Sequence, residues 1–230
     1  MNKDVIIACD FAGKEQTLTF LDRFPEGEKP FVKVGMELFY AEGPAIVREL
    51  KSRGHRVFLD LKLHDIPNTV RKAMAVLSGL GVDLCNVHAA GTVEMMRAAR
   101  EGLGPDALLI AVTQLTSTSE ERMQRELLID ADMPSAIAHY ARNAKEAGLN
   151  GVVCSPLEVP LVKECCGTAF LAVTPGIRFA DSAADDQVRI TTPARARELG
   201  SDFIVVGRPV TAAQDPVAAW KQCRKDFLGL

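Results

Sequence analysis

Arg56-Val57-Phe58-Leu59-Asp60-Leu61 is a short stretch that is nearly continuous in its hydrophobicity. A strand with one face in water alternates apolar and polar residues, so an unbroken run of this kind is typical of parallel strands that are covered on both faces. Similar runs rich in Val, Ile, Leu and Phe recur along the chain, at 5–9, 31–35, 83–88, 107–113, 151–154, 169–173 and 203–207. The sequence therefore predicts eight parallel strands.

Segments with helical periodicity lie between these runs. In residues 42–53, Ile46, Val47 and Leu50 recur at a spacing of three to four beside charged residues. One face of such a helix can pack while the other stays in water. The same pattern predicts helices over 67–79 and 93–103, and two helical segments, 119–129 and 134–147, in the long connection between the fifth and sixth strands.

Glycines follow several of these helical patterns just before a strand, as glycines that end helices do. They are Gly54, Gly81, Gly148 and Gly200. Strand and helix thus alternate eight times, and eight βα units close a tilted barrel. We therefore expect an α/β fold, a (β/α)8 TIM barrel, rather than an open doubly wound sheet. Such barrels commonly occupy about 200–250 residues, and no linker or low-complexity tract divides the chain, so residues 1–230 are expected to form one domain.

Composition excludes several classes of function. The chain has 27 Lys+Arg, 30 Asp+Glu and no dense basic stretch, which disfavours a nucleic-acid-binding protein. No apolar run approaches the roughly 20 residues that cross a bilayer, and the N-terminal run reaches Asp10 too soon for an export signal. The six cysteines lack C-x-x-C spacing, so we interpret them as reduced thiols rather than zinc ligands. A cytoplasmic protein is expected.

Charged residues interrupt the ends of the first three predicted strands. Asp10 closes the first, Lys33 lies in the second, and Asp60 and Lys62 end the third, with Asp65 three residues later. Catalytic groups of barrel enzymes lie at the carboxyl ends of the strands, and residues two apart on a strand share a face. The spacing Asp60-x-Lys62-x-x-Asp65, with Lys33, predicts an alternating array that keeps both lysines protonated. The alternative is a structural ion-pair network. Four charged residues that all face one mouth of the barrel favour a functional site over this alternative.

A second group of residues follows the seventh and eighth strands, in Thr174-Pro175-Gly176-Ile177-Arg178 and in Val206-Gly207-Arg208-Pro209. In barrels these loops often hold a phosphate, because glycine lets backbone N–H groups approach and arginine offers a bidentate fork. The alternative interpretation is that these glycines only form turns and that the arginines are ordinary surface residues. Residues 179–191 are polar and are interpreted as a lid, and His64 is interpreted as a residue that orients its loop.

These residues resemble a known family. The segment Asp60-Leu61-Lys62-Leu63-His64-Asp65-Ile66-Pro67-Asn68-Thr69 is similar to the signature of orotidine 5′-monophosphate decarboxylases, in particular the bacterial form. Asp10, Lys33, Asn86-Val87-His88-Ala89, Leu115-Thr116-Ser117, Pro175-Gly176-Ile177-Arg178 and Gly207-Arg208 extend the resemblance over the whole chain. It implies a homodimeric barrel that binds a nucleotide at the strand carboxyl ends and needs neither a metal nor an organic cofactor.

The resemblance also implies a role for each matching residue. Lys62 would protonate C6 of the pyrimidine, with Asp60 beside the substrate carboxylate. Lys33 and Asp10 would contact the ribose, while Asp65 and Thr69 would reach the site of the partner subunit. Thr116 would read the pyrimidine edge. Phosphate ligands would be Arg178, Gln187, Gly207 and Arg208, and the rest of the substrate-binding segment would comprise Leu61, Leu63, His64, Ile66, Pro67 and Asn68.

Two other functions fit part of the pattern. Mg²⁺-dependent sugar-phosphate enzymes of the same barrel group share the Asp-x-Lys-x-x-Asp spacing, but the continuation through Thr69 and the pair Thr116-Ser117 favour the nucleotide enzyme. A nucleotide-binding protein without activity would keep the phosphate site, yet the charged residues at 60, 62 and 65 are all present.

Overall fold

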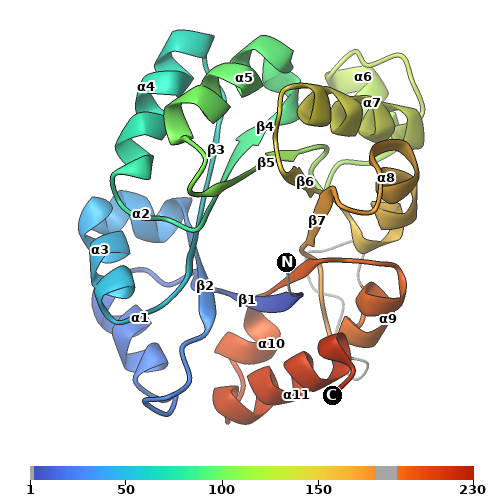
Figure 1. Ribbon diagram of the computed structural model, residues 1–230. Helices are drawn as coiled ribbons and strands as arrows, with labels where there is room; N and C mark the ends of the chain where they lie inside the picture. The colour runs from blue at the N-terminus through green and yellow to red at the C-terminus, as the bar shows by residue number, and fades with distance from the viewer. Residues whose placement is uncertain (1–2, 180–190) are drawn as a thin grey trace.

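The computed structural model describes residues 3–179 and 191–230, and its strands form a closed parallel barrel in sequence order (Figure 1). The strands are β1 (Asp4–Ala8), β2 (Phe31–Gly35), β3 (Val57–Leu63), β4 (Leu84–His88), β5 (Leu108–Val112), β6 (Gly151–Val153), β7 (Leu171–Thr174) and β8 (Phe203–Val206). Pairing of β1 with β8 closes the barrel. The predicted (β/α)8 barrel is confirmed, and each predicted run overlaps one strand. That residues 1–230 form a single domain stays a prediction.

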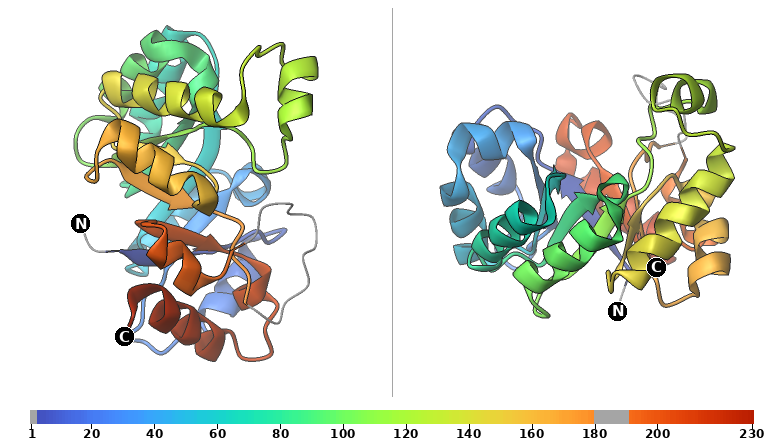
Figure 2. Two further views of the ribbon diagram at one scale, coloured as in Figure 1. Left: turned by 90° about the vertical axis from the view of Figure 1, so that its right-hand side faces the viewer. Right: turned by 90° about the horizontal axis from the view of Figure 1, so that it is seen from above.

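Helices surround the barrel on its outside (Figures 1 and 2). They are α1 (Lys14–Leu21), α2 (Met36–Glu42), α3 (Pro44–Ser52), α4 (Pro67–Ser78), α5 (Thr92–Leu103), α6 (Glu120–Glu126), α7 (Met133–Glu146), α8 (Val159–Cys166), α9 (Pro193–Glu198), α10 (Arg208–Thr211) and α11 (Pro216–Leu228), with the short 3₁₀ helices η1 (Ala89–Gly91) and η2 (Pro156–Glu158). In the described part of the chain, none of these helices is long and apolar enough to cross a membrane.

The helix predicted over 42–53 begins later than expected, and a second helix, α2, precedes it. Gly43 separates the two with a φ of +64°, and Pro44 then occupies the first turn of α3. A left-handed glycine ends one helix, and a proline without an N–H is well suited to start the next. The glycines expected to end helices do so with positive φ: Gly54 at 84°, Gly81 at 69°, Gly148 at 80° and Gly200 at 96°. All six cysteines are free thiols, as predicted.

The strands are buried on both faces. Val5 and Ile7 point outward into the core between strands and helices, whereas Ile6 points into the barrel. Inside the amino end, the rings of Phe31 and Phe203 lie 6.0 Å apart, edge to face, and Arg56 stacks over Phe31 at 4.1 Å. Side chains therefore fill the amino end of the barrel, which leaves the carboxyl end for a site.

A repeated clamp ties the amino ends of the strands together. In three places the residue just before a strand accepts hydrogen bonds from a backbone N–H at the start of the preceding strand and from a basic side chain of an outer helix. The three sets are Asp83 with Val57 N (2.7 Å) and Lys51 (2.6 Å), Asn150 with Leu109 N (2.8 Å) and Arg100 (3.0 Å), and Asp202 with Ala172 N (2.8 Å) and Lys163 (2.6 Å). These hydrogen bonds stabilise the amino end of the barrel, which lies opposite the carboxyl ends of the strands.

Candidate active site

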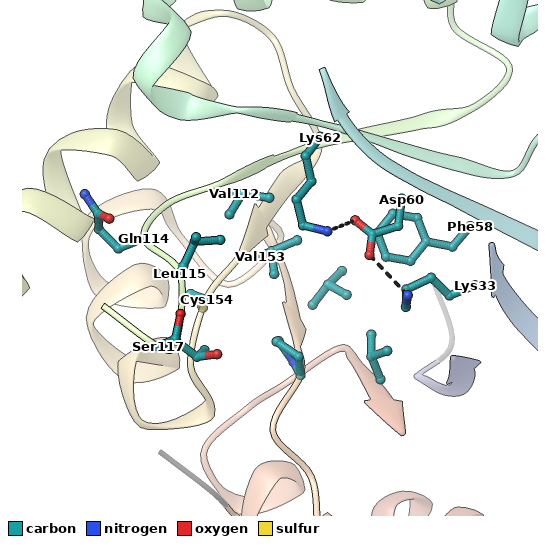
Figure 3. A pocket seen from close by; sticks show the side chains of 14 residues that line it. Lys33, Phe58, Asp60, Lys62, Val112, Gln114, Leu115, Ser117, Val153 and Cys154 are labelled. Atoms are coloured by element: carbon teal, nitrogen blue, oxygen red, sulfur yellow. Dashed lines mark hydrogen bonds and ion pairs between the residues drawn. The ribbon is translucent and has the colours of Figure 1, made fainter. Parts of the chain in front are cut away.

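Four charged side chains meet at the carboxyl ends of β1, β2 and β3. The ammonium nitrogen of Lys33 lies 2.8 Å from Oδ1 of Asp10 and 3.4 Å from Oδ2 of Asp60. The ammonium nitrogen of Lys62 lies 2.7 Å from Oδ1 of the same Asp60 (Figure 3). Carboxylates and ammonium groups thus alternate in the order Asp10, Lys33, Asp60, Lys62.

The strand register and one glycine place these groups side by side. Gly35 of β2 pairs with Asp60 of β3, so Asp60 lies two residues nearer the carboxyl end of the barrel than Lys33. A Cβ on Gly35 would lie 3.0 Å from Oδ1 of Asp10 and 3.1 Å from Nζ of Lys33. Glycine at this position therefore gives the Asp10–Lys33 ion pair room to lie over the backbone.

Burial and neighbouring charges have opposite effects on the pKa values of Lys33 and Asp60, the two central members of this charged array. Lys33 and Asp60 are each 8% exposed. Burial disfavours the charged form of Lys33, but Asp60 and Asp10 outweigh it, so the pKa of Lys33 is raised. Burial likewise disfavours ionised Asp60, yet Lys33 and Lys62, with hydrogen bonds from Lys62 and Asn86, hold the pKa of that carboxyl below its usual range. Both groups are therefore charged at neutral pH.

The array borders a cavity in the barrel mouth. Apolar residues of the strands form one part of its lining: Phe58, Val112, Val153, Val173 and Val205. Gln114, Leu115 and Ser117 lie across the cavity from Lys33 (Figure 3), and Thr116 also lines the cavity. The cavity has a volume of about 190 Å³ and a mostly apolar lining, to which Lys33, Asp60 and Lys62 add charge.

A second, more polar cavity of about 420 Å³ adjoins the first. Asp10, Gly176, Arg178, Gly207 and Arg208 line it. Both cavities share Lys33, Pro175 and Val205 in their walls, so they lie side by side, with Lys33 of the array between them and two arginines at the far end of the second. The two together are called the joined cavity below.

Eight of the predicted site residues lie around this joined cavity: Asp10, Lys33, Asp60, Lys62, Thr116, Arg178, Gly207 and Arg208. Gln187 and most of the stretch 179–191, interpreted above as a lid, lie outside the described residues. No group of three or more His, Cys, Asp or Glu side chains within 3–179 and 191–230 is arranged to hold a metal ion.

Asp65 does not join the array of its own chain, so the expectation drawn from spacing alone is wrong. Asp65 is exposed, and with His64, Ile66 and Pro67 it lines a separate surface hollow beside residues 90–92. The chain turns away from the barrel mouth after Lys62, and Asp10 supplies the second carboxylate instead.

The remaining residues of the predicted segment also lie away from the cavity within one chain. Leu61 is buried in the core between barrel and helices, and Leu63 packs against that core. Asn68 and Thr69 are exposed in the first turn of α4. The ring of His64 lies 5.8 Å from that of His88, measured between centroids, and its role in orienting the loop stays a prediction.

Asn86 contacts two members of the array, although the sequence pattern assigns it no role. Asn86 is 1% exposed. Its Oδ1 accepts the backbone N–H of Lys62 at 2.8 Å, and its Nδ2 donates to Oδ1 of Asp60 at 2.6 Å. Asn86 lies within the resemblance described above, and a polar residue in the middle of an apolar strand is a further signal that could have pointed to a role.

Comparison with known proteins gives consistent matches over nearly the whole chain. Residues 3–223 match a family model described as "Orotidine 5'-phosphate decarboxylase / HUMPS family". The orotidine 5′-phosphate decarboxylase of Streptococcus thermophilus is 60% identical over 222 residues, which are 96% of each chain. That of Bacillus cereus is 56% identical over 237 residues, covering 100% of this chain and 99% of the relative.

Solved structures agree with these sequence matches. Orotidine 5′-phosphate decarboxylase from Lactobacillus acidophilus superposes with a TM-score of 0.89 at 41% identity, covering 98% of this chain and 99% of that one. An uncharacterized conserved protein from Geobacillus kaustophilus gives a TM-score of 0.87 at 49% identity, covering 97% and 99%.

Proposed function

This chain belongs to the orotidine 5′-phosphate decarboxylase / HUMPS family, and from that membership we propose how its residues act. Curated relatives that are 56% and 60% identical over nearly the full length are orotidine 5′-phosphate decarboxylases. The chain is accordingly a carboxy-lyase of pyrimidine biosynthesis that converts orotidine 5′-monophosphate to UMP and carbon dioxide. The alternating charges of Asp10, Lys33, Asp60 and Lys62 at the cavity carry the proposal for its mechanism.

The joined cavity suits the three parts of a nucleotide. Arg178, Gly207 and Arg208 at the polar end offer two guanidinium groups and accessible backbone for the phosphate. The pyrimidine occupies the apolar end, where Thr116 can hydrogen bond its edge. The ribose then lies between them, beside Asp10, because Lys33 lines both cavities and its ion-pair partner Asp10 lines the polar one.

The chemistry requires a cation at the pyrimidine end. When the bond from C6 to the carboxylate breaks, its electron pair stays on C6 in an sp² orbital that cannot delocalise into the ring π system. Stabilisation must therefore be electrostatic, and a fixed ammonium ion supplies it without reorganisation. Lys62 provides this ammonium and then transfers a proton from Nζ to C6. Solvent returns a proton to the neutral amine after UMP is formed.

Asp60 and Lys33 keep the proton donor in place before the substrate arrives. Asp60 lies between two ammonium groups, 2.7 Å from Nζ of Lys62 and 3.4 Å from Nζ of Lys33. An ionised Asp60 attracts both cations, and it favours the charged form of Lys33. Binding energy from the phosphate, remote from C6, can then be used to bring the substrate carboxylate towards this array.

A homodimer completes the proposal. Asp65 and Thr69 are assigned to the site of the partner subunit. This assignment is supported by the exposure of Asp65 in a hollow away from Lys62 of its own chain, and by the neighbouring Ile66, an apolar side chain that is 67% exposed. Covering this surface with a second copy would bury Ile66 and bring a further carboxylate to each array. A cytoplasmic location stays a prediction.

The test follows the ultraviolet absorbance of orotidine 5′-monophosphate after addition of EDTA-treated protein, with carbon dioxide trapped in parallel. The proposal expects stoichiometric conversion to UMP and carbon dioxide at a rate that EDTA leaves unchanged. A folded protein that acts only on ketose phosphates, and only with Mg²⁺, would contradict it and assign the chain to the sugar-phosphate branch of the barrel group.

A further inference from the structure

Strand β3 leaves regular strand geometry at Lys62. Its φ is +52°, in the left-handed region that side chains other than glycine rarely adopt. The register with β4 shifts at the same point: Leu59 pairs with Cys85, but the next pair is Leu63 with Val87. A backbone conformation of this kind persists only where the surroundings hold it, and such positions cluster at active sites.

Asn86 of β4 supplies the hydrogen bond that the shifted ladder does not. Its Oδ1 accepts the backbone N–H of Lys62 at 2.8 Å. An unpaired N–H in this largely buried place would be costly. The side chain of Asn86 therefore stabilises the left-handed turn at Lys62.

The same side chain also holds the carboxylate that Lys62 contacts. Nδ2 of Asn86 donates to Oδ1 of Asp60 at 2.6 Å, and Nζ of Lys62 donates to the same oxygen at 2.7 Å. The three residues form a closed set of hydrogen bonds that joins the two ends of Lys62, its backbone N–H and its ammonium. An amide suits this place because it carries an acceptor and a donor on one planar group.

We propose that Asn86 is a positioning residue of the decarboxylation, which directs the ammonium of Lys62 and the carboxylate of Asp60 into the cavity. The inference rests on the proposed function of Lys62. Asn86 is absent from the described residues that line the joined cavity, so it acts through its two neighbours. Its loss should impair the chemical step while leaving nucleotide binding at the phosphate end.

Asn86→Ala tests this directly. A shift of about 1 Å in a reacting group can cost about 100-fold in rate, so kcat should fall by about that factor. KM and the affinity for UMP, measured by calorimetry, should stay within about threefold because the phosphate ligands are untouched. The pH profile should also move: without the bond from Asn86 the pKa of Asp60 rises, so the acid limb of kcat shifts to higher pH.

Asn150→Ala is the matched control. Asn150 also joins a backbone N–H to a charged side chain, because its Oδ1 accepts from Leu109 N and from Arg100, but it does so at the amino end of the barrel. Its loss should lower the melting temperature while leaving kcat and the pH profile unchanged. If the two variants lose stability alike and neither loses kcat, Asn86 is structural only and the inference is overturned.

Asn86→Asp gives an independent test that also serves if Asn86→Ala fails to fold. When protonated, the introduced carboxylic acid can donate to Asp60 and accept from Lys62 N–H, as the amide does; when ionised, it repels Asp60. Its kcat relative to the native chain should therefore rise as pH falls, whereas that of Asn86→Ala should decline. A relative kcat that does not change with pH would contradict the inference. Failure of the native chain itself to decarboxylate the nucleotide would instead overturn the proposed function.

Discussion

The ammonium nitrogen of Lys62 lies 2.7 Å from Oδ1 of Asp60, although Lys62 has left strand geometry with a φ of +52°. In a regular strand, residues two apart share a face, but their side chains run parallel. The turn at Lys62 instead brings its ammonium back onto the carboxylate of Asp60. One ion pair thus places a cation at the apolar end of the cavity, where a C6 carbanion would form.

Replacing Lys62 should separate binding from chemistry. Lys62→Ala removes the ammonium ion that stabilises the carbanion and protonates it, so kcat should fall by about 10³-fold or more. UMP should still bind, because the phosphate ligands lie at the other end of the joined cavity. Single-turnover absorbance measurements and calorimetry check the two quantities. Lys51→Ala, which removes a lysine of the amino-end clamp, is the control, and near-native kcat in Lys62→Ala would refute the assigned role.

Mixing two inactive variants tests whether Asp65 serves the partner subunit. Lys62→Ala and Asp65→Ala should each have little activity as homodimers. If Asp65 acts across the interface, a mixed dimer has one site with both residues intact and one site with neither. Unfolding and refolding an equal mixture should then restore about a quarter of native activity. No recovery in a mixture shown to contain mixed dimers would place Asp65 in its own site.

The arginine beside Gly207 should govern nucleotide affinity. Arg208→Ala removes a charge-assisted hydrogen bond from the phosphate end, so kcat/KM should fall by about 10- to 100-fold and UMP should bind correspondingly more weakly. Steady-state kinetics and a UMP titration measure both. Arg195→Ala on α9, where Arg195 pairs with Glu198 at 2.9 Å, should leave both values unchanged. Equal effects of the two substitutions would argue against phosphate binding by Arg208.

The array should stabilise the protein over a defined pH range. The pKa of Asp60 is lowered in the folded chain, so its contribution is present above the unfolded value of about 3.9 and is lost as pH falls through the folded value. The pKa of Lys33 is raised, so its contribution is present below about 10.4 and is lost as pH rises through the folded value.

Urea unfolding of the native chain and of Asp60→Asn can measure this contribution. The difference in the free energy of unfolding should be constant from about pH 5 to pH 9 and should shrink on either side. A difference that grows as the pH falls below 4 would contradict the assignment of charges.

The amino-end clamp should affect stability without affecting catalysis. Asp202→Ala removes the acceptor for Lys163 and for the N–H of Ala172, and it leaves both donors partly buried. The free energy of unfolding should fall by about 2–4 kcal/mol. Urea unfolding gives this value, and kcat of the folded variant should match the native one. A large loss of kcat with unchanged stability would show that this end is coupled to the site.

The fold was predictable because it depends on local patterns. Doubly buried strands need continuous apolar runs, and the glycines that end helices need positive φ, as the run at 56–61 and Gly54 show. The break between α2 and α3 was missed because the apolar periodicity of 42–53 conceals the signal of Gly43 followed by Pro44.

The sequence could predict only those site residues whose position is set by the end of a strand. Asp10, Lys33 and Asp60 lie at the barrel mouth because strand alternation puts them there. Spacing alone misplaced Asp65, because it cannot show that the chain turns at Lys62, a residue with no intrinsic preference for left-handed geometry. That turn depends on Asn86, which is 24 residues away in the sequence and meets Lys62 only when β3 and β4 pair.

The central claim, that Lys62 exchanges a proton with C6, is tested most directly by following the C6 proton of UMP in D₂O by nuclear magnetic resonance. A group that protonates the C6 carbanion must also be able to remove that proton from UMP. The native enzyme should therefore catalyse replacement of the C6 proton by deuterium, and Lys62→Ala should not. Equal exchange rates for the two proteins, both saturated with UMP, would contradict the account.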